Sequence, residues 1–272
     1  YDIPLNPQSV LDVSKEEFKS EFQARWEKGG TQFLAAYGDL LLKPEANEKA
    51  AEFVKEMIRD TVEDPTVAEL LCPTNIIGCK RLCVDTDYYK TYNKSNVKLV
   101  DVSETPINRI VPSGIAHKGI EHQFDSIVFA TGFDAMTGAL FNIDIRGRDG
   151  RSLKEKWDGG PQTYLGLTTN GFPNMFTVTG PGSPSVLTNM LPSIEQHVNF
   201  ISDCISYMRE NGHSKIEPEL EAELNWGVHV NEVADLSLRS TCASWYVGAN
   251  VPGKPRVFTP YIGGFPRYVE RC

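Results

Sequence analysis

Apolar residues are spaced differently in the two parts of this chain. Before about residue 77 they recur every three or four positions, as Phe18, Phe22 and Trp26 do, and this period is typical of helices with one buried face. After that point, short β-branched and aromatic runs alternate with turn residues, which is the pattern of strands. The chain is therefore predicted to combine a helical first part with a mixed second part.

Three helices are predicted in the first part. Ser14 followed by Glu17 forms a capping-box pattern at the start of the first helix, and Gly29 interrupts or kinks that helix. A second apolar stripe covers residues 50–62, and a short third helix covers residues 65–71. We interpret the aromatic stripe as core packing, because this part of the sequence contains no combination of residues suited to catalysis.

Short strands are predicted from residue 78 onwards. Residues 97–102 alternate between apolar and polar, and residues 109–111 and 115–117 flank a Pro-Ser-Gly turn that predicts a hairpin. Residues 125–130 form a continuous apolar run, which is the pattern of a strand buried on both faces. A further β-branched run, residues 174–179, is predicted to be a strand that leads into a glycine-rich turn.

That glycine turn, residues 180–185, reads Gly-Pro-Gly-Ser-Pro-Ser and precedes a stripe of helical period over residues 194–208. In the order strand, turn, helix, backbone N–H groups and the helix dipole favour an anionic or electron-accepting guest. The turn is similar to the dinucleotide pattern G-x-G-x-x-G, but Ser185 stands at the third glycine position and no following strand offers an acid to a ribose. The residues by themselves therefore favour a tight turn over an independent phosphate cradle.

Composition narrows the class of protein. The chain has 272 residues, 40% of them hydrophobic and 23% charged, and is globular by these measures. Its formal net charge of −9 argues against a nucleic-acid surface, which needs a basic stripe. There is no apolar run of membrane-spanning length and no signal-peptide pattern at residues 1–4, so a soluble cytoplasmic protein is expected.

Cysteines and short motifs exclude several further classes. The six cysteines form no C-x-x-C pair, and we expect free thiols rather than a disulfide or metal framework; they are Cys72, Cys79, Cys83, Cys204, Cys242 and Cys272. The patterns G-x-S-x-G, H-E-x-x-H and G-K-[ST] are absent, which argues against hydrolase, zinc protease and P-loop functions. His197 shares the apolar face of its predicted helix with Ile194 and Ile201, so it is interpreted as a core histidine rather than a base.

Five stretches of this chain resemble one family. The run GPGSPSVLTNMLPSIEQHV from Gly180 resembles the flavin-proximal loop of Baeyer–Villiger monooxygenases, enzymes that use FAD and NADPH to insert oxygen beside a ketone carbonyl. Four further stretches resemble the same family in the same order, and the resemblance covers about residues 11–268; they are GCKRL from Gly78, DSIVFATGFDAMTGALFNIDIRG from Asp125, TYLGLTTNGFPNMF from Thr163 and SWYVGANVPGKPRVF from Ser244.

The resemblance implies a carboxy-terminal half. Family members open with a glycine-rich FAD fingerprint and carry a second one for NADPH, and neither is present here. The implied fold class is α/β, part of a flavoprotein with Rossmann-like FAD and NADP domains and a helical insertion. On this basis residues 1–76 are a helical subdomain of the NADP domain, 77–133 the end of that domain, and 134–272 the end of the FAD domain. Such a chain alone is expected to be inactive and to hold FAD poorly, because the missing amino-terminal half carries the phosphate cradle.

The resemblance also implies roles for individual residues. Lys80 would bind the 2′-phosphate of NADPH, and Arg81 would lie over the flavin and stabilise the negatively charged peroxyflavin and the anionic ketone adduct. Trp245 would lie on a mobile, glycine-hinged loop over NADP and hydrogen-bond the ribose, with Lys254 solvated at the end of that loop. Met190 would present its backbone to the pyrimidine end of the flavin. The substrate pocket would be lined by Ser185, Val186, Leu187, Thr188 and Met190.

The implied reaction takes a ketone and O2 to an ester or lactone, with no metal ion. Two other functions stay open. The chain could be a non-catalytic module that binds a partner polypeptide or a small ligand through the surface that the missing half would cover. It could instead belong to the related flavin N-hydroxylases and S-oxygenases. The sequences SPSVLTNM and GANVPGK disfavour this alternative, because they resemble the Baeyer–Villiger group more closely.

Overall fold

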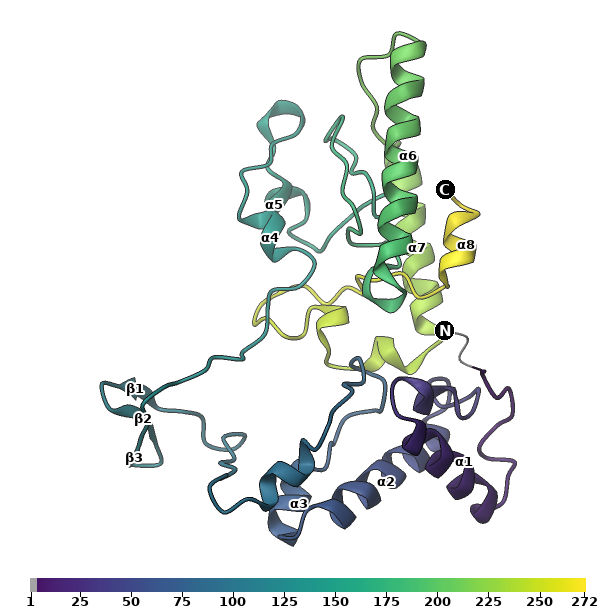
Figure 1. The fold of residues 1–272 in the computed structure, drawn as a ribbon. Coiled ribbons are helices and arrows are strands. Elements are labelled where there is room, and N and C mark those ends of the chain that lie inside the picture. The colour runs from purple at the N-terminus through teal and green to yellow at the C-terminus, as the bar shows by residue number, and fades with distance from the viewer. Residues whose placement is uncertain (1–3) are drawn as a thin grey trace. The chain divides into compact units, whose positions relative to one another are not determined.

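The structure is a computed structural model that describes residues 4–272 (Figure 1). Its contacts divide these residues into two compact units. The first unit comprises residues 4–37, 48–75 and 83–132, and the second comprises residues 38–47, 76–82 and 133–272. The predicted three-part division into 1–76, 77–133 and 134–272 differs from these units and stays a prediction.

The first unit is built on helices and one small sheet. Its elements are α1 (Lys15–Lys28), the 3-10 turns Gln32–Ala35 and Tyr89–Asn93, most of α2 (Pro44–Thr61), α3 (Pro65–Leu71), β1 (Arg109–Val111), β2 (Gly114–His117) and β3 (Ile120–Gln123). Ser14 caps α1 by accepting a hydrogen bond from the Glu17 N–H at 3.2 Å, and Gly29 ends the helix with a positive φ of 69°. The three predicted helices are confirmed.

The predicted aromatic stripe forms the core of this unit. Phe22 is fully buried, and its ring lies 5.0 Å from that of Phe33 and 5.4 Å from that of Phe53. Trp26 stands at the edge of the cluster and is 37% exposed. The interpretation of the stripe as packing rather than a cofactor site agrees with these contacts.

The predicted hairpin is confirmed, but two predicted strands are wrong. The strands β1 and β2 pair antiparallel with Ile110 opposite Ile115, and β3 continues the sheet on the other side of β2. Residues 97–102 and 125–130 belong to no strand, and Val128 is 88% exposed. A strand forms only where a second chain segment accepts its N–H groups, and no described residue does so for residues 125–130.

The second unit consists of helices joined by long loops (Figure 1). Its helices are α4 (Gly138–Phe141), α5 (Leu153–Lys156), α6 (Met190–Glu210), α7 (Leu220–Asp235) and α8 (Phe265–Val269), with 3-10 turns at Arg148–Gly150, Ser185–Leu187, Leu238–Thr241 and Trp245–Val247. The helix predicted over 194–208 is confirmed as part of α6. The strand predicted over 174–179 is wrong, because its N–H groups bond to loops instead, as the Thr177 N–H does to Leu167 O at 2.8 Å.

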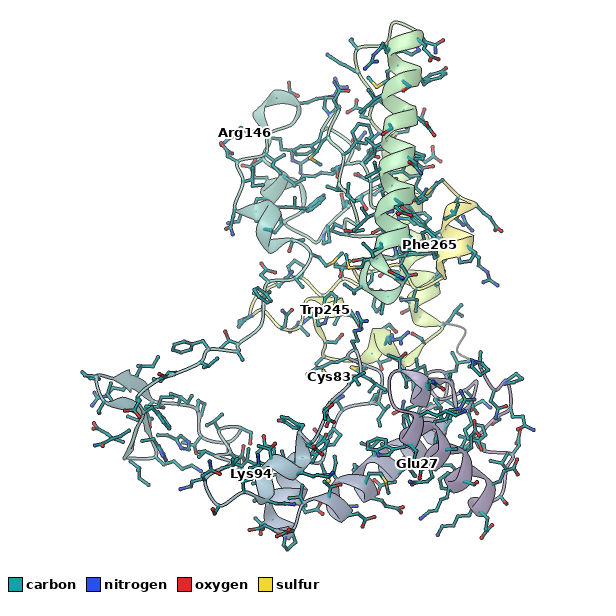
Figure 2. All side chains as sticks on the ribbon, in the orientation of Figure 1. Glu27, Cys83, Lys94, Arg146, Trp245 and Phe265 are labelled. Carbon is teal, nitrogen blue, oxygen red and sulfur yellow. A yellow bond between two sulfur atoms is a disulfide. The ribbon has the colours of Figure 1, made fainter. Side chains whose placement is uncertain are left out.

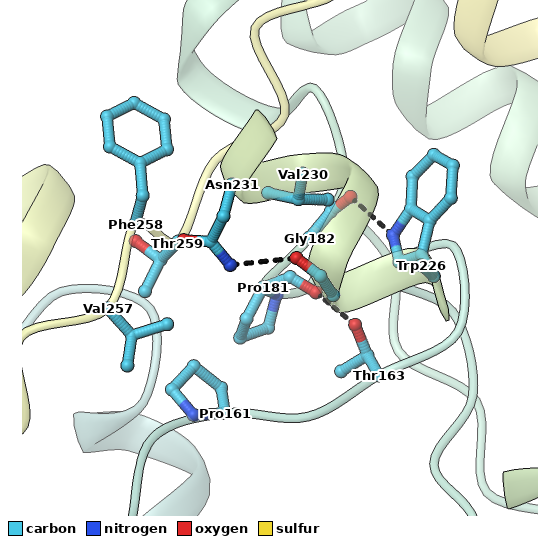
Figure 3. Close-up of a pocket in the computed structure, with 11 residues that line it drawn as sticks. Pro161, Thr163, Pro181, Gly182, Trp226, Val230, Asn231, Val257, Phe258 and Thr259 are labelled. Atoms are coloured by element: carbon cyan, nitrogen blue, oxygen red, sulfur yellow. Dashed lines mark hydrogen bonds between the residues drawn. The ribbon is translucent and has the colours of Figure 1, made fainter. Parts of the chain in front are cut away.

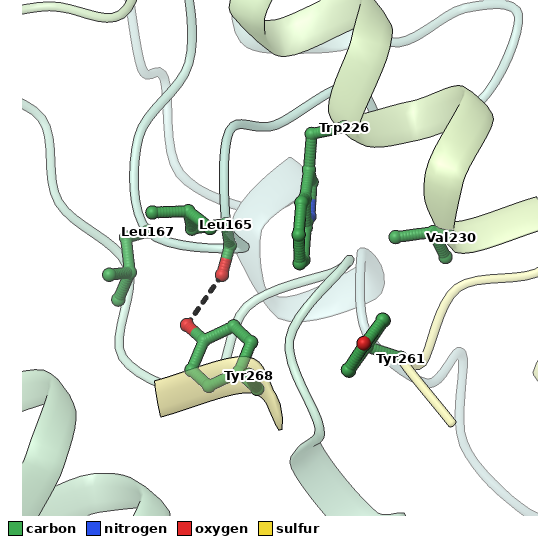
Figure 4. Packing of buried hydrophobic residues seen from close by; sticks show 6 residues of the cluster. All are labelled: Leu165, Leu167, Trp226, Val230, Tyr261 and Tyr268. Atoms are coloured by element: carbon green, nitrogen blue, oxygen red, sulfur yellow. Dashed lines mark hydrogen bonds between the residues drawn. The ribbon is translucent and has the colours of Figure 1, made fainter. Parts of the chain in front are cut away.

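Aromatic and aliphatic side chains from the helices α7 and α8 and from two loops form the main core of the second unit (Figure 4). The cluster comprises Leu165, Leu167, Trp226, Val230, Tyr261 and Tyr268. The rings of Trp226 and Tyr261 lie 5.3 Å apart, and the Tyr268 hydroxyl donates to Leu165 O at 2.6 Å. Buried aromatic polar groups thus find partners in the loop backbone and hold the loops on the helices.

The expectation that all cysteines are free is wrong for one pair. Cys79 and Cys242 are joined by a disulfide, with 5.9 Å between their Cα atoms. The sequence spacing cannot indicate this pair, because the two cysteines are 163 residues apart. Of the remaining cysteines, Cys72, Cys204 and Cys272 carry free thiols.

Candidate functional site

Two side chains and one backbone N–H hold the carbonyl groups of the glycine turn, and Figure 3 shows the two side-chain bonds. Thr163 Oγ1 donates to Pro181 O at 2.6 Å, and Trp226 Nε1 donates to Gly182 O at 3.1 Å. The Tyr261 N–H donates to the next carbonyl, Ser183 O, at 2.8 Å. Three successive peptide groups are therefore fixed to three separate parts of the unit.

The N–H groups of this turn are used inside the protein. The Gly182 N–H donates to Thr259 O at 2.6 Å, and the Ser183 N–H donates to Gly180 O at 3.1 Å. A Cβ atom on Gly180 would lie 2.6 Å from Gly166 O, so this glycine permits a close approach of two backbones. The expectation that these two amides face an anionic guest is wrong, and the interpretation as a tight turn holds.

A small cavity of about 40 Å³ lies beside the turn (Figure 3). It is lined by residues that include Pro161, Trp226 and Asn231, and none of the predicted site residues lines it. A space of this size accommodates water rather than a cofactor or a ketone.

Two of the predicted substrate-facing residues, Val186 and Leu187, share one packing cluster with Trp245. Ala234, Tyr246 and Phe258 form its buried centre, and the partly buried Val186, Leu187 and Trp245 pack against them. Trp245 is labelled in Figure 2, and its ring lies 4.4 Å from that of Tyr246. Residues that are far apart in the sequence thus meet on one side of α7.

The other predicted substrate-facing residues differ in exposure. Ser185 is buried, with its Oγ 3.7 Å from Met136 Sδ, whereas Thr188 is partly buried. Met190 begins the 21-residue helix α6 and is 36% exposed. Asn189 caps this helix by accepting a hydrogen bond from the Leu191 N–H at 3.1 Å, so the positive end of the helix dipole lies at Met190.

Lys80 and Arg81 are exposed and lie on a segment that is tied to residues near Trp245. Next to them, Gly78 O accepts a hydrogen bond from Arg239 Nε at 3.1 Å, and Cys79 forms the disulfide with Cys242. Burial raises the pKa of the Tyr246 phenol, and the positive charges of Arg239 and Arg81 act in the opposite direction. Arg81 is therefore within electrostatic reach of the cluster that contains Trp245.

The segment after Trp245 has glycine hinges and anchored ends. Gly248 and Gly253 have positive φ values of 71° and 77°. Lys254 forms an ion pair with Asp134 and donates to Ala135 O at 3.0 Å, and its side chain is only 12% exposed. The expectation that Lys254 is solvated is wrong, because the ammonium group of Lys254 is paired with the Asp134 carboxylate.

Several residues of this region were not identified from the sequence. Asp134 and Met136 lie within one of the five family-like stretches, so their place in that stretch was an available signal. Arg239 had no sequence signal, because its contact with Gly78 spans 161 positions. A larger cavity of about 430 Å³ adjoins the Trp245 segment and is lined by Cys242, Ala243, Val247, Ala249 and residues of α7, among others.

His197 is a core histidine, as expected. It is fully buried, and burial lowers the pKa of its imidazole to about 4. A neutral, enclosed ring is not available to accept a proton from a substrate.

Comparison with known proteins identifies relatives over nearly the whole chain. A cyclohexanone 1,2-monooxygenase from Acinetobacter sp. is 40% identical over 269 residues, which are 97% of this chain and 49% of the relative. A phenazine N-monooxygenase from Lysobacter antibioticus is 38% identical and is matched over 96% of this chain and 48% of its own length. No protein-family model matches the chain.

Solved structures also match nearly the whole chain and about half of each matched protein. A steroid monooxygenase bound to NADP has a TM-score of 0.89 and 47% identity, and the match covers 98% of this chain and 50% of that protein. The chain therefore spans about half the length of the relatives it matches. A monooxygenase solved in complex with FAD and NADP matches with a TM-score of 0.92 and 39% identity over 98% of this chain and 50% of its own length. Together these matches confirm the predicted α/β class, part of a flavoprotein with FAD and NADP domains.

Proposed function

This chain belongs to the Baeyer–Villiger monooxygenase family, and we propose that it forms the carboxy-terminal half of an FAD- and NADPH-dependent enzyme. The enzyme inserts one oxygen atom of O2 beside a ketone carbonyl and forms an ester or lactone. The observation that supports this most is that residues 78–82, 185–190 and 242–254 belong to one compact unit. These are the segments that the family resemblance associates with coenzyme, flavin and substrate.

The available donors fit the two cofactors. Lys80 and Arg81 offer exposed positive charge suited to a phosphate and to developing negative charge, and Trp245 offers an indole N–H. Ser244 Oγ is buried with no hydrogen-bond partner among the described residues, so it has an unused hydroxyl directly beside Trp245. Bound FAD and NADPH would supply the electrons and activate O2.

Within this arrangement each residue has a separate role. Lys80 holds the 2′-phosphate of NADPH, and Trp245 binds the sugar that NADPH shares with NADH. Arg81 stabilises negative charge during oxygen insertion, because a guanidinium stays protonated throughout and presents planar donors. Met190 places a backbone group at the flavin, while Val186 and Leu187 provide apolar contact for the ketone.

The experiment that tests this proposal is Arg81→Ala in the complete enzyme. Ketone oxidation should fall by at least about a hundredfold, the usual effect of removing one such charge stabiliser, while reduction of the flavin by NADPH continues. Arg151→Ala, which removes an exposed arginine of the same unit outside the three segments, is the matched control. Full ketone oxidation by the Arg81 variant would refute the assignment.

Oxygenation of nitrogen is a second candidate, since one relative at 38% identity is a phenazine N-monooxygenase. The complete enzyme should be offered a cyclic ketone and an aromatic N-heterocycle under the same conditions. An ester or lactone from the ketone supports the first proposal, and an N-oxide as the sole product supports the second. The missing amino-terminal half is the proposed partner of this chain in either case.

No helix within residues 4–272 has both the length and the apolar character that crossing a bilayer requires. The cytoplasmic location stays a prediction. Limited proteolysis of the complete enzyme near residue 133, where the second unit resumes, tests the proposed boundary between the two dinucleotide-binding domains.

A further inference from the structure

The glycine turn is preceded by a backbone conformation that its residue type disfavours. Thr179 has a φ of 53°, in the left-handed region, where a β-branched side chain is a rare outlier. Leu165, in the neighbouring loop, has a φ of 58° and is buried. Such conformations persist only where surrounding contacts enforce them, and they concentrate at functional sites.

One histidine lies between these two positions. The Thr179 N–H donates to Nδ1 of His197 at 2.9 Å, and Nε2 of the same ring lies 2.8 Å from the Tyr268 hydroxyl. That hydroxyl in turn donates to Leu165 O at 2.6 Å. A single buried chain of hydrogen bonds therefore joins Thr179 to Leu165.

The direction of each hydrogen bond in this network follows from the groups at its two ends. A backbone N–H can only donate, so Nδ1 of His197 is the acceptor and carries no proton. The Tyr268 hydroxyl gives its proton to Leu165 O, so it can only accept from His197, and Nε2 carries the ring proton. The network thus selects the neutral Nε2–H tautomer, with every donor and acceptor in use.

The two joined positions border the segment that the proposed function places at the flavin and substrate. Thr179 immediately precedes Gly180, and Leu165 immediately precedes Gly166, where a Cβ atom would lie 2.5 Å from Ser183 N. The two loops are therefore in direct backbone contact. A shift at Thr179 would move the glycine turn and, with it, residues 183–190.

We propose that His197 is a positioning residue, whose Nδ1 holds the Thr179 N–H and thereby sets the position of residues 183–190. This inference rests on the proposed function only for the identity of the groups that residues 183–190 face. The hydrogen-bonded positioning itself concerns this chain alone.

Two substitutions separate positioning from simple filling of the core. An asparagine at this position places a side-chain oxygen near the location of Nδ1, whereas a glutamine places its amide N–H near the location of Nε2. His197→Asn therefore keeps the contact with Thr179 and loses that with Tyr268, and His197→Gln does the reverse. Tyr268→Phe is a further variant that leaves the Thr179 contact in place.

The experiment is made in the complete enzyme with these three variants. Amide hydrogen exchange in a peptide covering residues 177–190 should rise roughly tenfold in His197→Gln, the effect of one lost hydrogen bond, and stay near wild type in His197→Asn and Tyr268→Phe. The visible flavin spectrum and the KM for ketone should change in His197→Gln only.

Equal exchange over residues 177–190 in the two His197 variants, with changes in Tm alone, would overturn the proposal and leave His197 as core filling. If His197→Asn does not fold, the contrast between Tyr268→Phe and His197→Gln decides the question in the same way. A wild-type enzyme that produced no oxygenated product would refute the proposed function, whereas the exchange comparison would still decide the positioning role.

Discussion

Residues 125–130 and 174–179 have a similar apolar and β-branched pattern but different environments. Both are short, largely apolar or β-branched runs that predict strands, and neither is a strand in the structure. The backbone of 174–179 is tied to other loops and to His197 by hydrogen bonds. Residues 125–130 have no backbone partner among residues 4–272, and Val128 and Phe129 are 88% and 66% exposed.

The difference shows that an apolar run predicts burial and backbone hydrogen bonds, but does not predict which part of the protein supplies the partner groups. For residues 174–179 the partners are loops and helices of this chain. For residues 125–130 they would come from the amino-terminal half that this chain's relatives possess, since a strand buried on both faces needs neighbours on both sides. Four experiments test this comparison.

The largest expected effect is on stability. Trp226→Ala removes the indole that packs in the core cluster and donates to Gly182 O, and should lower the free energy of unfolding by about 3–5 kcal/mol. Phe129→Ser should change it by less than about 0.5 kcal/mol in this chain, because its side chain is exposed. Urea denaturation measures both. Equal losses would mean that residues 125–130 are already packed within this chain.

The second effect depends on pH and reports on His197. Its pKa is about 4 in the folded chain and 6.5 ordinarily, so below pH 6.5 the unfolded chain binds a proton that the folded chain does not. Stability should therefore fall by up to about 3 kcal/mol as pH drops from 6.5 to 4. Tyr268 lies beside the ring, and Cys272 contacts Tyr268; burial raises the pKa of both groups, so neither changes charge in this range.

The matched control is the same titration of His197→Asn. Its stability should vary less between pH 6.5 and 4, because no imidazole gains a proton on unfolding. A fall of the same size in this variant would assign the pH dependence to other groups. Since residues 125–130 have no comparable buried titratable contact, their exposure should not change over this range.

The third effect concerns coenzyme binding and tests whether the segments that contain Lys80 and Trp245 bind NADPH. In the complete enzyme, Lys80→Ala should raise the KM for NADPH by about ten- to a hundredfold, because a charge-assisted bond to a phosphate is worth about 1.5–3 kcal/mol. The KM for NADH, which lacks that phosphate, should stay nearly constant. Trp245→Ala should weaken both coenzymes. Equal weakening of both by Lys80→Ala would remove Lys80 from the phosphate site.

The smallest effect concerns the ion pair at the end of the Trp245 loop. Asp134→Asn should cost about 1 kcal/mol or less, because the Asp134 side chain is 39% exposed and its pairing is partly screened by water. Proteolysis within residues 248–254 should nevertheless become faster. An unchanged rate would mean that Asn250, which donates to Phe133 O at 2.8 Å, holds the loop without the ion pair.

Local patterns predicted the elements whose causes are local. The capping residue Ser14, the helix over residues 65–71 and the hairpin at Pro112 all follow from interactions within a few positions, and the structure has them. The family resemblance located Lys80, Arg81 and Trp245 as candidate site residues, and the structure places Val186, Leu187 and Trp245 in one cluster. Their roles stay predictions.

The sequence by itself determined the three helices of the first part, the helix over residues 194–208, the hairpin and the family of this protein, because side-chain spacing and caps act within one or two turns of chain and the five family-like stretches are contiguous. It did not indicate α7. Only the tertiary structure decided that Cys79 pairs with Cys242 and that Lys254 forms an ion pair with Asp134. It also decided that N–H groups of the glycine turn donate to carbonyl groups of the same chain. Those outcomes depend on groups that are distant in sequence and meet only after packing. Hydrogen bonds and burial stabilise contacts between such distant groups, and no local sequence pattern predicts these contacts.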